Sequence, residues 1–136
     1  MDDREPPKKR VLVVDDEPGI GAVLRIKLRL SGFEVTTTTS GAEAIELVST
    51  HEPDVMLVDI LMPDVTGMDV IDRVRLFSKI PIIVFTAKPD IATFAMELGA
   101  NDYIAKPFDP EQIVKKIKAV LIEDGSSSSE NTNPTR

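Results

Sequence analysis

The chain has 136 residues, of which 42% are hydrophobic and 29% are charged, so it is long enough for one domain with a packed core. Its 23 acidic residues outnumber its 16 lysines and arginines, and the net charge of −7 argues against direct binding of nucleic-acid backbones. Cysteine is absent and His51, expected on the surface, is the only histidine, which excludes disulfides, cysteine–zinc sites and multi-histidine metal sites.

The chain begins with a charged segment, residues 1–9, that contains two adjacent prolines. This segment lacks the apolar region of a secretory signal, and no stretch of the chain approaches about 18 consecutive apolar residues. We therefore predict a polar N-terminal tail and a soluble, cytoplasmic protein that does not bind a membrane.

The body of the chain alternates short apolar runs with segments of helical periodicity. Residues 11–14, 55–58 and 80–85 are continuously apolar, as is typical of strands in a parallel sheet that is covered by helices on both faces. The threonine-rich run 33–38 is better suited to an edge of the sheet. Residues 103–105 are a short candidate for the last strand.

The segments between these runs carry helix signals. Pro18 and Gly32 bound the first helix, and Ser40 with Glu43 forms a capping-box pattern at the start of the second. A short fourth helix is expected over about 90–98. The apolar residues predicted to face the core are Ile20, Val23, Leu24 and Leu28 in the first helix, Ile45 and Val48 in the second, Val70, Val74 and Phe77 in the third, and Ile113, Ile117, Val120 and Leu121 in the fifth.

The alternation gives five strand-then-helix units, (βα)5, and places the fold in the α/β class. Because crossovers between parallel strands are right-handed, the simplest assembly is a doubly wound, three-layer sandwich around a parallel five-stranded sheet. We predict strand order 2-1-3-4-5 and a domain over residues 10–122. The polar, serine-rich residues 123–136 are predicted to form a disordered C-terminal tail.

Polar side chains come directly after the apolar runs. Asp15 and Asp16 follow the first run, Asp59 the third, Thr86 the fourth and Lys106 the fifth. Since the carboxyl ends of parallel strands share one edge of the sheet, these groups should converge there. Each aspartate alone is equally well explained as a turn or cap residue, but the complete set favours a common site.

Three close carboxylates repel one another unless some are protonated or a cation joins them. Ligands that are all oxygen favour Mg²⁺ over zinc. One aspartate of such a cluster can act as a nucleophile toward a phosphoryl group. Lys106 would then supply a positive charge and Thr86 a hydroxyl, which suffices because phosphoryl transfer needs mainly positioning and charge neutralisation.

Four motifs at these strand ends are jointly very specific. They are VVDDE at 13–17, LVDILMPD at 57–64, FTA at 85–87 and YIAKPF at 103–108. From about residue 10 to residue 122, the sequence resembles the receiver domain of two-component response regulators, which implies a flavodoxin-like, CheY-like fold.

The resemblance implies a role for each acidic residue of the set. Asp59 would be the phosphoacceptor, supplied by a phosphohistidine on a sensor histidine kinase or a phosphotransfer protein. Asp15 and Asp16 would hold Mg²⁺ together with Asp59 and the backbone carbonyl of Leu61.

The resemblance also implies how a phosphoryl group would change the domain. Lys106 would pair with the phosphoryl group, and its peptide bond to Pro107 would be cis. Thr86 would turn its hydroxyl toward the phosphoryl oxygens, and Tyr103 would swing inward as Thr86 moves. The surface formed by the fourth helix, the last strand and the fifth helix would then change, because phosphorylation shifts a two-state equilibrium.

The implied function is therefore that of a phosphorylation-dependent signalling switch and not of an enzyme with a free substrate. We expect a stand-alone receiver that controls a downstream protein target, with a homodimer formed on phosphorylation as a further expectation. Two alternatives stay open. One is a receiver fragment of a larger regulator or hybrid kinase, which the sequence does not separate from a stand-alone receiver. The other is a receiver-like interaction module that works without phosphorylation, which the intact set of Asp15, Asp16, Asp59, Thr86 and Lys106 argues against.

Two features depart from the family pattern. The spacing of 20 positions from Thr86 to Lys106 is short, so the fourth helix or the loop before it, which would contain Pro89, is expected to be shortened. Leu61 and Lys88 occupy positions that the family varies to tune the lifetime of the phosphoryl group.

Two enzyme-like interpretations fit the sequence less well. A haloacid-dehalogenase-like phosphatase would need a second aspartate at position 61, where this chain has Leu61. A nucleotide-binding module would need a glycine-rich phosphate loop after the first strand, and none is present there.

Overall fold

The computed structural model describes the backbone of residues 7–131 and the side chains of residues 7–122. Strands and helices alternate along this part of the chain, and the strands pair in parallel in the order β2-β1-β3-β4-β5, which confirms the predicted α/β fold. The elements are β1 (Arg10–Val14), α1 (Pro18–Leu30), β2 (Glu34–Thr38), α2 (Gly41–His51), β3 (Val55–Asp59), α3 (Gly67–Val74), β4 (Ile82–Thr86), α4 (Pro89–Leu98), β5 (Asp102–Ala105) and α5 (Pro110–Asn131).

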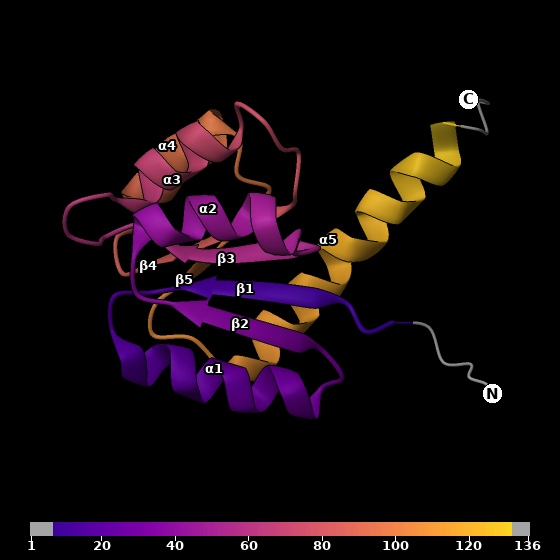
Figure 1. Ribbon diagram of the computed structural model, residues 1–136, viewed down its shortest axis with the longest axis horizontal. Coiled ribbons are helices and arrows are strands. Elements are labelled where there is room, and N and C mark those ends of the chain that lie inside the picture. The colour runs from indigo at the N-terminus through magenta and orange to yellow at the C-terminus, as the bar shows by residue number, and fades with distance from the viewer. Residues whose placement is uncertain (1–6, 132–136) are drawn as a thin grey trace.

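The helices cover both faces of the sheet and make three layers (Figure 1). Successive side chains of a strand point to opposite faces, so β1 contributes Val11 and Val13 to one core and Leu12 and Val14 to the other. The first core is closed by α1 and α5, and the second by α2, α3 and α4. Such double burial explains why the central strands read as continuous apolar runs.

The more polar strand lies where the sequence predicts it. β2 pairs only with β1 and so forms one edge of the sheet. Thr36 and Thr37 are half-buried there, since a strand at the edge is covered less completely than one in the centre.

Two residues predicted to face the core do not. Val23 is half exposed, because α1 buries only the side that carries Leu24 and Leu28. Phe77 is also half exposed, because α3 ends at Val74 and the chain turns away before the predicted stripe reaches it. In both cases the predicted helical spacing is correct, but the face of the helix that packs against the core is smaller than predicted.

The capping box predicted at Ser40 is only half formed. The Ser40 hydroxyl accepts a hydrogen bond from the backbone N–H of Glu43, but the Glu43 carboxylate accepts one from the Thr38 hydroxyl instead of bonding back. A complete capping box occurs at the start of α3, where Thr66 and Asp69 cap each other.

Helix α4 begins directly after a very short connection. Pro89 is its first residue and does not lie in the preceding loop, so only Ala87 and Lys88 separate α4 from β4. The helix has ten residues and is followed by Gly99, whose φ of 120° suits glycine.

An arginine outside α4 satisfies the end of this helix. The Arg75 guanidinium donates hydrogen bonds to the Gly99 carbonyl at 2.8 and 3.1 Å and to the Ser78 carbonyl and the Asn101 side chain, both at 3.1 Å. Asn101 in turn accepts from the backbone N–H of Ile82 at 2.8 Å. The hydrogen bonds of Arg75 therefore connect the loop before β4 with the loop before β5.

Helix α5 continues past the sheet as far as Asn131 (Figure 1). Residues 1–6 and 132–136, and the side chains from 123 onward, lie outside the described residues. The division into polar tails at 1–9 and 123–136 therefore stays a prediction. Within the described chain, no helix has the length and apolar character needed to cross a lipid bilayer.

Candidate functional site

Four strands deliver the predicted site residues to one edge of the sheet. Asp15 directly follows β1, Asp59 ends β3, Thr86 ends β4 and Lys106 directly follows β5. The backbone N–H of Lys106 donates to the Thr86 carbonyl at 2.9 Å, which extends the pairing of the last two strands by one residue into the site. Parallel strand order therefore gathers residues that are far apart in the sequence.

Asp15, Asp16 and Asp59 form an acidic cluster. One carboxylate oxygen from each lies within 4.8 Å of the other two. Asp15 and Asp59 are buried, whereas Asp16 is more exposed, so the cluster opens to solvent on one side. Three oxygen donors at this separation are consistent with a metal site.

Lys106 joins two of these carboxylates. Its ammonium Nζ lies 3.0 Å from Oδ2 of Asp59 and 3.3 Å from Oδ2 of Asp15, and its side chain is 19% exposed. Burial alone would lower the pKa of Lys106, but the hydrogen bond and charge of Asp59, followed by those of Asp15, outweigh it and raise the pKa. Lys106 is therefore a cation throughout the neutral pH range.

The surroundings of Asp15 disfavour a negative charge on its carboxylate. Burial raises its pKa, and the nearby charge of Asp59 adds to the rise. The backbone N–H of Glu17, 2.8 Å from Oδ1 of Asp15, and the ammonium of Lys106 act in the opposite direction without cancelling the effect. The formal charge of three carboxylates and one ammonium is −2, which is the charge that a divalent cation balances.

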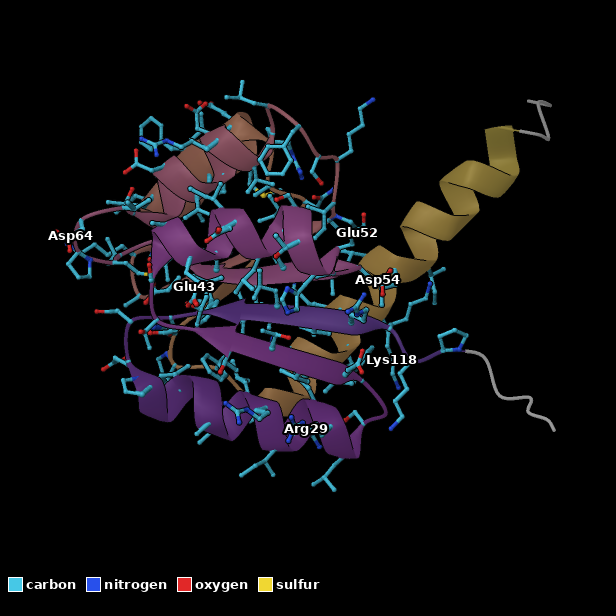
Figure 2. All side chains as sticks on the ribbon, in the orientation of Figure 1. Arg29, Glu43, Glu52, Asp54, Asp64 and Lys118 are labelled. Carbon is cyan, nitrogen blue, oxygen red and sulfur yellow. The ribbon has the colours of Figure 1, made fainter. Side chains whose placement is uncertain are left out.

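The loop after β3 fixes Asp59. The backbone N–H of Leu61 donates to Oδ1 of Asp59 at 3.1 Å. At Gly67 a Cβ atom would lie 2.5 Å from the Asp59 carbonyl oxygen, so only glycine allows α3 to begin this close to the strand. Asp64, at the outer turn of the loop, adopts a φ of 64° (Figure 2).

The two predicted switch residues differ in their exposure. Thr86 is fully buried, and its hydroxyl oxygen accepts a hydrogen bond from the backbone N–H of Lys88 at 3.0 Å. Tyr103 is 41% exposed, and among the described residues its side chain makes no hydrogen bond to the acidic cluster. The space around the acidic cluster of Asp15, Asp16 and Asp59 is called the pocket below. Leu61, which follows Asp59 by two positions, is exposed, and Lys88 lies on the surface. The Lys106–Pro107 bond is cis, as predicted, and His51 is exposed at the end of α2.

Two aromatic residues at the site were not identified from the sequence as functional. The Lys106 ammonium lies 5.0 Å from the centre of the Phe85 ring, and Phe108 meets this ring edge-on. Both residues lie in motifs quoted from the sequence, FTA at 85–87 and YIAKPF at 103–108, but the sequence does not show that the two rings meet beside Lys106. A hollow of about 430 Å³ beside Lys106 is lined by Ile20, Ala87, Lys106, Pro107 and Phe108.

A doubly wound α/β sheet with clustered carboxylates and a lysine at its carboxyl edge defines a class of small domains suited to receive a phosphoryl group. Residues 11–118 match the family model described as response regulator receiver domain, and the chain belongs to this family. Receivers are regulatory phosphoacceptor domains of two-component systems that interact with histidine kinases, and they are not classical enzymes.

Curated relatives and solved structures agree with this assignment. The chain is 42% identical over 116 residues to a protein of Guillardia theta named "Probable transcriptional regulator ycf27", covering 84% of this chain and 46% of that protein. It is 38% identical over 116 residues to the DNA-binding response regulator MtrA of Mycolicibacterium smegmatis, covering 84% and 51%. The chain thus spans about half the length of these relatives.

The structure is also similar to the receiver domain protein (CheY-like) of Methanospirillum hungatei. The TM-score is 0.84 at 27% sequence identity, and the match covers 89% of this chain and 99% of that one.

Proposed function

We propose that this domain is a signalling switch that accepts a phosphoryl group on Asp59 from a phosphohistidine. The observation that carries the proposal is the convergence of three carboxylates within 4.8 Å, two of them joined to Lys106. In the transfer, a carboxylate oxygen of Asp59 forms the new bond to phosphorus as the phosphorus–nitrogen bond to the imidazole breaks. The donor imidazole keeps the electron pair of that bond and takes up a proton.

The donor set fits Mg²⁺. All candidate ligands are oxygens, and the net charge of the cluster with Lys106 is −2. We assign Asp15, Asp16, Asp59 and the backbone carbonyl of Leu61 as the residues that would hold the ion. When bound, Mg²⁺ would neutralise charge on the phosphoryl oxygens.

Lys106 is the residue that compensates charge on the transferred group. Its ammonium already lies at hydrogen-bonding distance from Asp59 and is fixed by a second bond to Asp15. A phosphoryl group on Asp59 adds acceptor oxygens beside this ammonium, and charge-assisted bonds of that kind are the strong ones. Lys106 therefore favours the phosphorylated form.

Thr86 and Tyr103 form the conformational part of the switch. In the present conformation the Thr86 hydroxyl accepts from Lys88, so its own hydrogen is available to an acceptor at the pocket. A phosphoryl group supplies that acceptor, and movement of Thr86 makes room for Tyr103, which is now exposed on β5. The face around α4, β5 and α5 would then bind a downstream protein target or a second copy of the domain.

The surroundings of the pocket suit a protein donor. The hollow beside Lys106 is mostly apolar, with Ile20, Pro107 and Phe108 in its lining, and it adjoins the pocket without covering it. A sensor histidine kinase or phosphotransfer protein could rest an apolar surface there while its phosphohistidine enters the pocket. A donor of this kind would imply a cytoplasmic protein. The net charge of −7 disfavours direct binding to nucleic acid.

Phosphorylation by acetyl phosphate tests the proposal. Incubation with acetyl phosphate and Mg²⁺ should add one phosphoryl group to the intact protein, measured by mass spectrometry, with acetate as the leaving group. Asp59→Asn should abolish the gain. Asp64→Asn removes the same charge from the loop that follows Asp59 and should leave the gain unchanged. If the unaltered protein gains no mass, the domain acts as an interaction module without phosphorylation.

A further inference from the structure

The Lys106 ammonium has a third neighbour besides its two carboxylates. Its Nζ lies over the ring of Phe85, 5.0 Å from the ring centre, within the range of a cation–π contact. The three partners come from three strands: Asp15 follows β1, Asp59 ends β3, and Phe85 lies in β4 next to the pocket edge. The ammonium is therefore held from several sides.

The ring of Phe85 is itself fixed. Its side chain is 1% exposed. The Phe108 ring meets it at a centre-to-centre distance of 5.9 Å and an interplanar angle of 89°. This edge-to-face arrangement is one that aromatic pairs favour because the positive edge of one ring meets the negative face of the other. Phe85 consequently presents one constant face to Lys106.

We propose that Phe85 is a positioning residue that holds the Lys106 ammonium at Asp59, and this inference rests on the proposed function. The two carboxylates have other partners during phosphorylation, because they would also bind a metal ion and, at Asp59, the phosphoryl group. The aromatic ring neither ionises nor takes up a ligand. It therefore keeps its attraction for the ammonium whatever the carboxylates bind.

One further observation favours a role beyond simple packing, and another shows that packing must be separated from it. Four-fifths of the Lys106 side chain is shielded from water, and cation–π attraction is strongest where the cation is desolvated. The ring also lies on the same core face as Leu57 and Ile104, so its removal would leave the lysine stem above a gap. A packing role alone would depend on the shape of residue 85 and not on the charge distribution of its ring.

Fluorinated phenylalanines at position 85 separate these two roles. Each added fluorine weakens the negative ring face while leaving the ring size almost unchanged. The rate constant for phosphorylation by acetyl phosphate should fall with each fluorine, by about 5- to 30-fold across the series. The same series in a Lys106→Met background should be flat, because the cation is gone.

Phe33 provides a matched control. It is buried in the same core face but lies at the opposite edge of the sheet, so its fluorination should not change the rate. A rate that is independent of fluorination at position 85, in a protein that is phosphorylated normally, overturns the positioning role and leaves the proposed function intact. An unaltered protein that gains no phosphoryl group overturns both.

Discussion

Replacement of Lys106 by methionine should destabilise the metal-free domain at neutral pH. Methionine keeps an unbranched side chain of similar length over Phe85 but removes the charge. Asp15 and Asp59, both buried, then lose the ammonium at 3.3 and 3.0 Å. Each pair corresponds to about 5 kcal/mol of Coulomb energy at an effective dielectric constant of about 20, before desolvation is subtracted.

The net loss is smaller than the Coulomb energy. Removing one partner of a buried ion pair costs about 3–5 kcal/mol. Lys106 is partly exposed, and Asp15, whose pKa burial already raises, can take up a proton to relieve the repulsion. We therefore expect the free energy of unfolding to fall by about 2 kcal/mol, and the loss to grow as the pH rises and the carboxylates ionise.

Urea denaturation followed by circular dichroism measures this loss, first with a chelator and then with Mg²⁺. The ion should stabilise the variant more than the unaltered protein, because the variant leaves three uncompensated carboxylates. The exposed Lys118 (Figure 2) offers a control, and Lys118→Met should change the unfolding free energy by no more than about 0.5 kcal/mol. Unchanged or increased stability of the metal-free Lys106→Met protein would refute the electrostatic argument.

Three further predictions concern Gly67 and Asp15 at the site and Arg75 at the opposite edge of the sheet. Gly67→Ala should cost about 2–4 kcal/mol of unfolding free energy in urea titrations, because its Cβ would meet backbone atoms at 2.5 Å, whereas Gly19→Ala, with open space at Cβ, should be neutral or stabilising. In the metal-free protein, the proton on the Asp15 carboxyl is bound more tightly in the folded state than in the unfolded state, because the pKa of Asp15 is raised. The free energy of unfolding should therefore fall as the pH rises from 3.8, the ordinary pKa, through the raised pKa of the folded protein. Asp15→Asn should remove this fall, and a pH profile that the substitution leaves unchanged would contradict the raised pKa of Asp15. Arg75→Met should accelerate amide hydrogen exchange in the last turn of α4, which loses its partner at the Gly99 carbonyl, and equal exchange in the two proteins would exclude that coupling.

The fold and most of the site could be predicted because both depend on local chemistry in a regular topology. Strands buried on two faces must be continuously apolar, and the charged residues that interrupt them must lie at their ends. Asp15, Asp59 and Lys106 were found in this way, and the parallel order of the strands brought them together.

The remaining features depend on neighbours that the sequence does not indicate. Helical spacing predicted that Phe77 shares a face with Val74, but not that the helix ends between them. The pattern at Ser40 did not reveal that the Thr38 hydroxyl competes for Glu43. The contact of Phe85 with Lys106 joins two residues whose relation depends on the rotamer of a long side chain. Side-chain geometry of this kind is fixed only by the packed structure.

The close approach of Gly67 to Asp59 has a consequence for signal direction. No side chain fills the space between the end of β3 and the first turn of α3, so a displacement of the Asp59 main chain would push on the helix itself. The same loop also lies close to the preceding helix α2, since a Cβ atom at Gly41 would lie 2.5 Å from the Val65 carbonyl oxygen. A displacement of the Asp59 main chain would therefore reach the α2–α3 layer through close backbone contacts, without involving Thr86 or Tyr103.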